Sequence, residues 1–582
     1  MEILSHRKFR LFLLLFLSGI AVGIFVLAVL PYGTFKGLFD SLMRDGDFES
    51  LRASNAIVFR SYLTLAGLGV LVLVFVASGK WRFDRKRFRE ELSGLWCFLR
   101  PGKGETPFLV ALVIITLFGV AIRLTKIYAP VSHDEAYTIT VFSPSLWYAV
   151  TNYHAPNNHV LHTVLVHIST AFLGLYPWAV RLPAFLAGTL LIPAAYFLGK
   201  AIYDSYSGIL AAMLVAGWPE QISYSTTARG YSLVALFALV TFWLGILVSK
   251  ERNRVAWLLL VIFSALGFYA VPVMLYPFGI LFIWLLLENT TKVPAEAYRS
   301  KIDFLKYWLL AGIATAVLTL LLYSPILIYG GVKQFFLAGE PNPFSRLVAL
   351  AQGSLRGMYF ELAAGIPHVV TYILIFGIFL SWIFHRRLSS LRIPIQAPAS
   401  VWIAIILVVQ RPNAWSRIWF PILALFAIWG SAGIAGLIKD FRIPKLRNVS
   451  LAIIPVSIAF IWIFSAGIKA IYDIPEAWAS KGKEESAILF LKDRLGEQDI
   501  IVAPTPQDAP LWYYSRLYGI ADRYFSRNSR PFQQAFLITV PKLGQYKQTV
   551  LEEFGLADSV DLQEIKLLKE INGMNIYEVP HK

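Results

Sequence analysis

Cysteine is almost absent from this chain. Cys97 is the single cysteine among 582 residues, so an intrachain disulfide bond is excluded, and cysteine spacing gives no information on the redox compartment. The first apolar run follows the basic stretch "SHRKFR" and lacks the small-residue cleavage site of a secretory signal peptide. We therefore expect that run to be a retained membrane span.

Charged side chains are also scarce. They make up 15% of the residues, against 57% hydrophobic residues, and the mean hydropathy is +0.60. An average soluble domain has about 25% charged and about 45–50% apolar residues, so this composition favours a polytopic membrane protein. The net charge of +17 lies mostly in short loops between apolar runs. Membrane topology and anionic lipid explain such a charge pattern without nucleic acid as a partner.

Long apolar runs fill most of the chain. A membrane-spanning helix needs roughly 20 mostly apolar residues, and by this criterion we expect about thirteen transmembrane helices. They are predicted near residues 11–30, 57–79, 107–127, 176–199, 208–226, 231–249, 255–272, 273–289, 308–328, 369–385, 398–411, 418–438 and 450–470.

The distribution of Lys and Arg predicts which loops face the cytoplasm. Basic blocks such as "KWRFDRKRFREE", "SKERNR" and "FHRRLSSLR" alternate with loops that are poorer in these residues, and Lys/Arg-rich loops stay inside. This puts the long loops 128–175 and 324–368 outside, together with the C-terminus of a protein of the plasma (inner) membrane. The apolar segment 159–175 would invert the later loops if it spanned, so we expect an interfacial helix there.

Hydropathy falls beyond residue 470, and a small α/β domain is predicted for 471–582. "ESAILFLKDRL" has the pattern of an amphipathic helix, whereas "DIIVAP" and "QAFLITV" are typical of buried strands. Asn572-Gly573 between two further strands predicts a hairpin with a type I′ turn. We thus divide the chain into two N-terminal spans with a basic inner loop (1–106), a main membrane domain (107–470) and an extracytoplasmic domain (471–582).

The first long outer loop begins with "PVSHDEAYTI" and concentrates polar side chains. Asp134 and Glu135 stand where the chain leaves the membrane, and an exposed acidic pair at such a place is most often only solvated. A loop of this length usually carries function, however, and a carboxylate there suits general-base catalysis on a headgroup at the interface. The other polar members of the loop are His133, Tyr137, His154, Asn157, Asn158, His159 and His162.

The same loop allows a second interpretation, as a metal site. His133, His154, His159 and His162 could bind a divalent ion together with Glu135. No two histidines have the H-x-x-x-H spacing, so the ligands would have to converge from across the loop. A divalent metal is the one cofactor that the sequence suggests, and none is required.

Four segments in order carry a family resemblance. "HDEAY", "HAPNNHVLH", "YPWAVRLPAFLAGTLLIPAAYFLGKAIY" and "STTARGYSLVALF" together resemble the GT-C glycosyltransferases. The nearest branch is that of the protein O-mannosyltransferases and the aminoarabinose-type lipid transferases, glycosyltransferase family 39. The resemblance covers roughly 107–470 and implies a GT-C fold that transfers a sugar from a polyprenyl phosphate, with inversion, to a glycan, lipid or protein acceptor at the outer face. Residues 11–79 precede the usual start of the family.

The resemblance assigns roles within the first outer loop. Asp134 corresponds to the catalytic base, and Glu135 to a partner that contacts acceptor or metal. Tyr137 is expected to face the phosphate. His159, with Asn158, stands where many members have a Lys-Pro or His-Pro element, so a phosphate or substrate contact is implied, although the lysine is missing here.

Arginines are expected to stabilise the leaving phosphate, because a guanidinium can donate two parallel hydrogen bonds to it. Arg229 and Tyr231 match an Arg-x-Tyr element, and Arg411 and Arg417 lie in "QRPNAWSRIWFP", where relatives carry an arginine near the phosphate. Snorkelling at a membrane end is the alternative for each of these arginines. Arg181 in "WAVRLP" is expected to be structural.

Two other functions remain open from the residues alone. A transporter or flippase for lipid or glycan would need ionisable residues near the middle of the bilayer, and few are found there. A non-catalytic receptor would use the C-terminal domain to bind a partner. The identities of the sugar and of the acceptor do not follow from the sequence.

Overall fold

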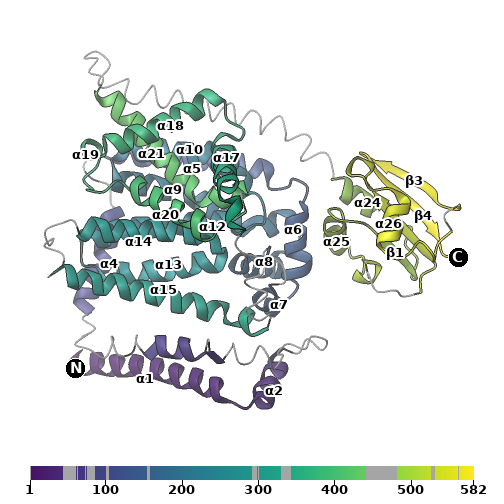
Figure 1. Cartoon of the computed structure of the whole chain (residues 1–582), viewed down its shortest axis with the longest axis horizontal. Helices are drawn as coiled ribbons and strands as arrows, with labels where there is room; N and C mark the ends of the chain where they lie inside the picture. The colour runs from purple at the N-terminus through teal and green to yellow at the C-terminus, as the bar shows by residue number, and fades with distance from the viewer. Residues whose placement is uncertain are drawn as a thin grey trace.

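The computed structural model describes residues 2–43, 60–61, 63–71, 74, 85–99, 102, 104–153, 157–290, 298, 300–329, 342–413, 415–440, 482–525, 531–561 and 563–582. The predicted span 450–470, nearly half of the span 57–79, and His154 lie outside these residues. Figure 1 shows a large helical body and, beside it, a small domain of mixed helices and strands that ends at the C-terminus.

Helices dominate the chain up to residue 440. The longer ones are α1 (Glu2–Val29), α2 (Tyr32–Met43), α4 (Arg85–Leu99), α5 (Thr106–Lys126), α8 (Val160–Leu173), α9 (Pro177–Ile202), α10 (Ser205–Gly217), α12 (Tyr231–Lys250), α13 (Arg254–Ala270), α14 (Leu275–Thr290), α15 (Lys301–Tyr329), α17 (Leu347–Ala363), α18 (His368–Ile383), α20 (Gln396–Val409) and α21 (Phe420–Asp440). Short elements between them are α6 (His133–Tyr137), η1 (Thr138–Phe142), α7 (Leu146–Thr151), α11 (Pro219–Ser225), η2 (Pro272–Met274), η3 (Phe344–Arg346), α19 (His385–Leu388) and η4 (Ser416–Trp419).

The helical body has the character of an integral multi-pass membrane protein. Six described helical segments are long and apolar enough to cross a membrane, and a seventh span results if the bent pair Phe344–Ala363 and His368–Ile383, at 113°, counts as one. Several shorter apolar helices, among them α8, α10, α13 and α20, accompany them. The predicted count of thirteen is therefore not confirmed over the described part of the chain. The predicted span 208–226 is divided into α10 and α11, because Pro219 cannot continue the hydrogen-bond ladder of α10.

Burial separates inner from outer helices. In α12 and α21, 78% of the apolar window is buried inside the protein, against 28% in α5 and 22% in α15. Large apolar side chains such as Leu117 of α5 are exposed to the surroundings, as expected for a surface that faces lipid. Helices α18 and α21 pack closely at Gly377 and Gly433, where a Cβ on Gly433 would overlap the carbonyl group of Gly377. Small residues allow such close helix packing in membranes.

The C-terminal domain is built around a four-stranded sheet. Its elements are α24 (Lys483–Lys492), β1 (Asp499–Val502), α25 (Asp508–Leu517), η5 (Asp522–Phe525), β2 (Gln534–Thr539), η6 (Pro541–Leu543), α26 (Lys547–Glu553), β3 (Lys566–Ile571) and β4 (Met574–Pro580). The strand order is β1-β2-β4-β3, with β1 parallel to β2 and the other pairs antiparallel. Asn572 and Gly573 have φ of 46° and 76° between the paired Ile571 and Met574. The predicted α/β fold and its hairpin are confirmed.

The C-terminal domain packs against the segment that follows α5. Helix α25 contacts α6, and apolar side chains from both sides, such as Ala136 and Leu511, form one buried cluster. Tyr514 Oη accepts a hydrogen bond from Val131 N–H at 3.1 Å, and Tyr513 Oη donates to the Leu175 carbonyl at 2.6 Å. Polar and apolar contacts therefore fix the domain on the first long loop of the helical body.

Candidate active site

Helix α6 presents Asp134 at the start of the first long loop. Ser132 is its N-cap, and the Glu135 carboxylate accepts hydrogen bonds from Ser132 N–H at 2.9 Å and Ser132 Oγ at 3.0 Å. This is a capping box, in which the Glu three residues after Ser fixes the first turn. The turn continues as the π-helix η1, a rare form that is frequent at functional sites.

Glu135 is held in a buried ion pair with Arg181 of α9. The two hydrogen bonds from Arg181 Nε and Nη2 measure 2.8 and 2.9 Å, and both side chains are 2% exposed. Ala228 N–H donates a further hydrogen bond to Glu135 Oε1 at 2.7 Å. Burial alone would raise the pKa of Glu135, but the charge and hydrogen bonds of Arg181 and the backbone donors lower it below its ordinary value.

The contacts of the Glu135 carboxylate differ from those that the family resemblance implied. Its oxygens bind Arg181, Ser132 and Ala228, whereas the resemblance implied contacts with acceptor or metal. Arg181 also donates to the carbonyl groups of Ile127, Ala129 and Pro130, in keeping with its expected structural role. The pair thus ties α6 to α9 and to the 228 segment, and so fixes the position of the neighbouring Asp134.

Asp134 lies between two arginines from distant parts of the chain. Its Oδ2 is 3.5 Å from Nη1 of Arg417 in η4 and 3.8 Å from Nη2 of Arg229. The side chain of Asp134 is 42% exposed, whereas that of Arg229 is 5% exposed. The close contact with His133 lowers the pKa of Asp134, and the charges of Arg229 and Arg417 lower it further against the opposing effect of burial. The structure therefore brings together the expected base and two of the three expected arginines.

His133 connects Asp134 to the C-terminal domain. Its Nδ1 is 3.7 Å from Asp134 Oδ1, and its Nε2 is 3.4 Å from Oδ1 of Asp508 in α25. The two nearby carboxylates raise the pKa of His133 to about 9. The imidazole is thus a cation at neutral pH. Sequence reasoning missed Asp508, because no local motif distinguishes it from other acidic residues of the domain.

The side chain of Arg229 contacts His159 and Tyr231. Gly230 N–H donates to His159 Nδ1 at 2.9 Å, the His159 and Tyr231 rings meet edge to face at 4.9 Å, and Arg229 lies 6.0 Å from the Tyr231 ring. Arg229 Nη2 is 3.3 Å from His159 Nε2, and Nη1 donates to the Asn157 carbonyl at 3.2 Å. Burial and the nearby Arg229 lower the pKa of His159 well below its ordinary value. His159 is therefore neutral and orients Arg229 rather than adding positive charge.

Arg417 stands at the side of an open groove. The groove has a volume of about 660 Å³ and lies between α17 and the 415–417 segment. Its walls include Arg356 and the aromatic side chains of Phe360 and Trp415, which are 64% and 50% exposed. Arg417 lies 4.5 Å over the Trp415 ring. A cationic end and exposed aromatic walls make this groove chemically suited to an amphiphile with an anionic headgroup.

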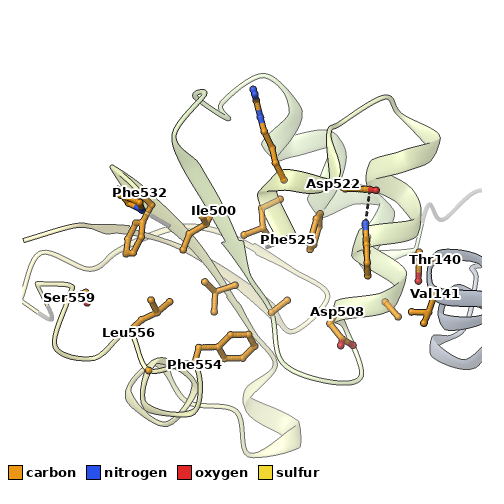
Figure 2. A pocket seen from close by; sticks show the side chains of 18 of the residues that line it. Thr140, Val141, Ile500, Asp508, Asp522, Phe525, Phe532, Phe554, Leu556 and Ser559 are labelled. Carbon is orange, nitrogen blue, oxygen red and sulfur yellow. Dashed lines mark hydrogen bonds between the residues drawn. The ribbon is translucent and has the colours of Figure 1, made fainter. Parts of the chain in front are cut away.

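Three expected site residues lie in other surroundings. Arg411 has φ of 43°, donates to the Asn342 and Val408 carbonyl groups and lies 5.8 Å from the Phe344 ring. Its contacts within the described chain do not include Asp134. Asn158 donates to the Ala149 and Asn152 carbonyl groups and accepts from Thr163, so it braces the loop. Tyr137 lies 5.9 Å from the His133 ring and lines the cavity of Figure 2.

The alternative metal site of the first long loop has no suitable arrangement of ligands among the described residues. They contain no group of three His, Cys, Asp or Glu side chains that could hold an ion. His133 faces two carboxylates, His159 binds Gly230, and the buried ring nitrogens of His162 have no hydrogen-bond partner within the described part of the chain. His154 lies outside it. The donors that are described thus do not fit a resident divalent ion.

Comparisons with known proteins agree with this architecture. Residues 157–329 match the family model described as dolichyl-phosphate-mannose-protein mannosyltransferase. The structure of ArnT from Cupriavidus metallidurans bound to undecaprenyl phosphate has 11% identity and a TM-score of 0.53, over 81% of this chain and 98% of ArnT. Its apo form gives 12% identity and a TM-score of 0.52 over the same shares.

A third similar structure is the oligosaccharyltransferase AglB from Archaeoglobus fulgidus, in complex with an inhibitory peptide and a dolichol-phosphate. It has 14% identity and a TM-score of 0.46, over 74% of this chain and 62% of AglB. No protein in a search of curated sequences matches the chain. Residues 157–329 thus match the mannosyltransferase family model, and the chain shares its fold with nearly the whole of ArnT.

Proposed function

We propose that the protein is a membrane glycosyltransferase that moves a sugar from a polyprenyl phosphate to a hydroxyl group of a glycan, lipid or protein, with inversion. The observation that carries the proposal is the convergence of Asp134 with Arg229 and Arg417 beside an open amphiphilic groove. The mannosyltransferase family match and the undecaprenyl phosphate bound to ArnT support the same class of reaction and donor.

The two arginines suit a lipid-linked phosphate as the leaving group. The phosphate binds Arg417 and Arg229, and the isoprenoid chain follows the groove past Phe360 and Trp415. Charge grows on the phosphate oxygens as the glycosidic bond breaks, and cations already in place stabilise that charge without reorganisation. The contacts with His159 and Tyr231 hold Arg229 in position for this role.

Asp134 is the general base of the proposed reaction. As the acceptor oxygen bonds to the anomeric carbon, Asp134 takes the proton of the hydroxyl group. The bond between that carbon and the phosphate oxygen breaks, and its electron pair leaves with the polyprenyl phosphate. Acceptor and phosphate lie on opposite sides of the sugar, so the configuration inverts.

The low pKa of Asp134 fits this sequence of events. In the structure, His133, Arg229 and Arg417 keep the carboxylate ionised and ready to accept a proton. A phosphate that binds the two arginines offsets their positive charge. The proton affinity of Asp134 therefore rises once the donor is present. Donor binding and activation of the base are then coupled through the shared arginines.

The proposal also concerns the side of the membrane on which the active site lies. The active site and the C-terminal domain face the outside of the inner membrane, where a polyprenyl phosphate presents its sugar to envelope acceptors. The bias of Lys and Arg towards the opposite loops supports this orientation. A flippase without transferase activity remains the alternative, and it predicts no covalent transfer of sugar.

Mass spectrometry of envelope glycans tests the proposal directly. Cells that lack the gene should lose one sugar modification, which the wild-type gene restores and the Asp134→Asn variant does not. Arg494→Ala is a matched control, because the side chain of Arg494 is exposed and contacts Phe490 of its own helical turn, away from the candidate active site. Restoration by Asp134→Asn at the wild-type level would remove Asp134 from the chemistry.

A further inference from the structure

Among the described residues, the carboxylate of Asp134 has no ion pair or hydrogen bond shorter than 3.5 Å to hold its direction. The nitrogens around it lie at 3.5, 3.7 and 3.8 Å, which are ion-pair distances rather than those of short hydrogen bonds. The side chain is also 42% exposed. Its orientation therefore depends on how firmly the neighbouring cations are themselves held.

His133 is the neighbour that Asp508 controls. Asp508 Oδ1 lies 3.4 Å from His133 Nε2, and the other ring nitrogen, Nδ1, lies 3.7 Å from Asp134 Oδ1. Thr505 Oγ1 donates to Asp508 Oδ2 at 3.3 Å, so the second oxygen of the carboxylate is bound within its own domain. An imidazolium has one N–H group on each ring nitrogen, so an ion pair between Asp508 and the Nε2 side favours the ring orientation that places Nδ1 near Asp134.

Contacts between the C-terminal domain and the helical body keep Asp508 next to His133. Arg516 of α25 donates to the Thr140 carbonyl at 3.0 Å and forms two hydrogen bonds with Asp522, at 2.8 and 2.7 Å. The hydrogen bond from Val131 N–H to Tyr514 lies on the same helix. Asp508, at the first turn of α25, is thus carried by a helix that is anchored on both sides of α6.

We propose that Asp508 is a positioning residue for Asp134 and acts through His133, so that the C-terminal domain supplies part of the active site. This inference rests on the proposed function, because it concerns the same base. It gives the domain a role in the chemical step, beyond covering the site or binding a partner.

A competing role for Asp508 is direct contact with the acceptor. Asp508 lines a cavity of about 870 Å³ where the two domains meet, together with Thr140, Val141, Trp512 and Phe525 (Figure 2). A carboxylate that binds acceptor hydroxyl groups would change KM for the acceptor. A carboxylate that positions the base would change kcat and leave KM unaltered, because the ground-state contacts of the substrates remain.

A double-mutant cycle on the full-length protein in lipid nanodiscs separates these roles. The probes are tritiated mannose and arabinose on undecaprenyl phosphate, with envelope extract from cells without the gene as acceptor. We expect Asp508→Asn to lower kcat about tenfold without changing KM for the extract, and Asp508→Glu to restore most of the loss. In the His133→Gln background, Asp508→Asn should have no further effect, since the link to Asp134 is already broken.

Ser559→Ala is the matched control for the cycle. Ser559 lines the same cavity but takes no part in the described contacts that hold α25 on the helical body, so its loss should change the rate by the same factor with and without His133. An equal factor for Asp508→Asn in both backgrounds, or a change in KM for the extract alone, would overturn the proposal.

Failure of the proposed function gives a different result. If the wild-type protein transfers no sugar from either donor, the glycosyltransferase assignment fails. The effects of the same substitutions are then measured as changes in the midpoint of thermal unfolding. Asp508→Asn should lower the midpoint less in the His133→Gln background than in the wild type. An equal decrease in both backgrounds would show that the two side chains do not interact.

Discussion

Arg417 offers the sharpest test of phosphate stabilisation. Its guanidinium is 3.5 Å from Asp134 and stacks 4.5 Å from Trp415, so the cation is held where the proposed phosphate leaves. A unit charge at about 4 Å from another is worth about 4 kcal/mol at an effective dielectric constant near 20. The side chain is 37% exposed, and we halve that figure for solvent screening.

The expected loss for Arg417→Ala is therefore about 2 kcal/mol, or about 30-fold in the rate of sugar transfer. Arg417→Gln should lose as much, because it keeps a hydrogen-bond donor but removes the charge, whereas Arg417→Lys should retain part of the activity. The assay is the initial rate of transfer from tritiated sugar on undecaprenyl phosphate in nanodiscs, with Arg494→Ala as control. Rates within twofold of the wild type for both neutral variants would refute the electrostatic argument.

Three further predictions concern pH and stability. The pKa of Asp134 is lowered and that of His133 is raised to about 9. Activity should therefore stay constant between about pH 5 and about pH 8 and fall as the pH rises through about 9. A fall in activity already at about pH 7 would contradict this expectation. Glu135→Ala should destabilise the protein by about 3–5 kcal/mol, since it leaves Arg181 buried without its partner, and unchanged thermal unfolding in detergent would be the contrary result. Gly433→Ala should separate α18 from α21 and cost about 1–3 kcal/mol by the same unfolding assay, and a stability equal to that of the wild type would argue against the close approach.

Local patterns were sufficient to predict many elements. Apolar runs of spanning length became α5, α9, α12 and α21, and the Asn572-Gly573 pair formed the expected hairpin turn. Such features depend on residues that are neighbours in the chain, so periodicity and turn chemistry determine them. The break between α10 and α11 was missed, although Pro219 carries the signal for it.

Contacts between distant segments could not be predicted in the same way. The family resemblance nominated Asp134, Arg229 and Arg417, yet it also nominated Arg411, only six residues from Arg417. The positive φ of Arg411 and the 3₁₀ turn of η4 give the two arginines different neighbours, and no local pattern shows which one meets Asp134. The partnership of Asp508 with His133 likewise arises from the packing of α25 on α6.

The central claim is that Asp134 removes a proton from the acceptor while Arg229 and Arg417 hold the departing phosphate. The most direct measurement is single-turnover transfer by purified Asp134→Asn protein that still binds undecaprenyl phosphate, as seen by native mass spectrometry. The account predicts normal binding of the lipid and a rate reduced by about 10²-fold to about 10⁴-fold. Transfer at the wild-type rate by this variant would contradict it.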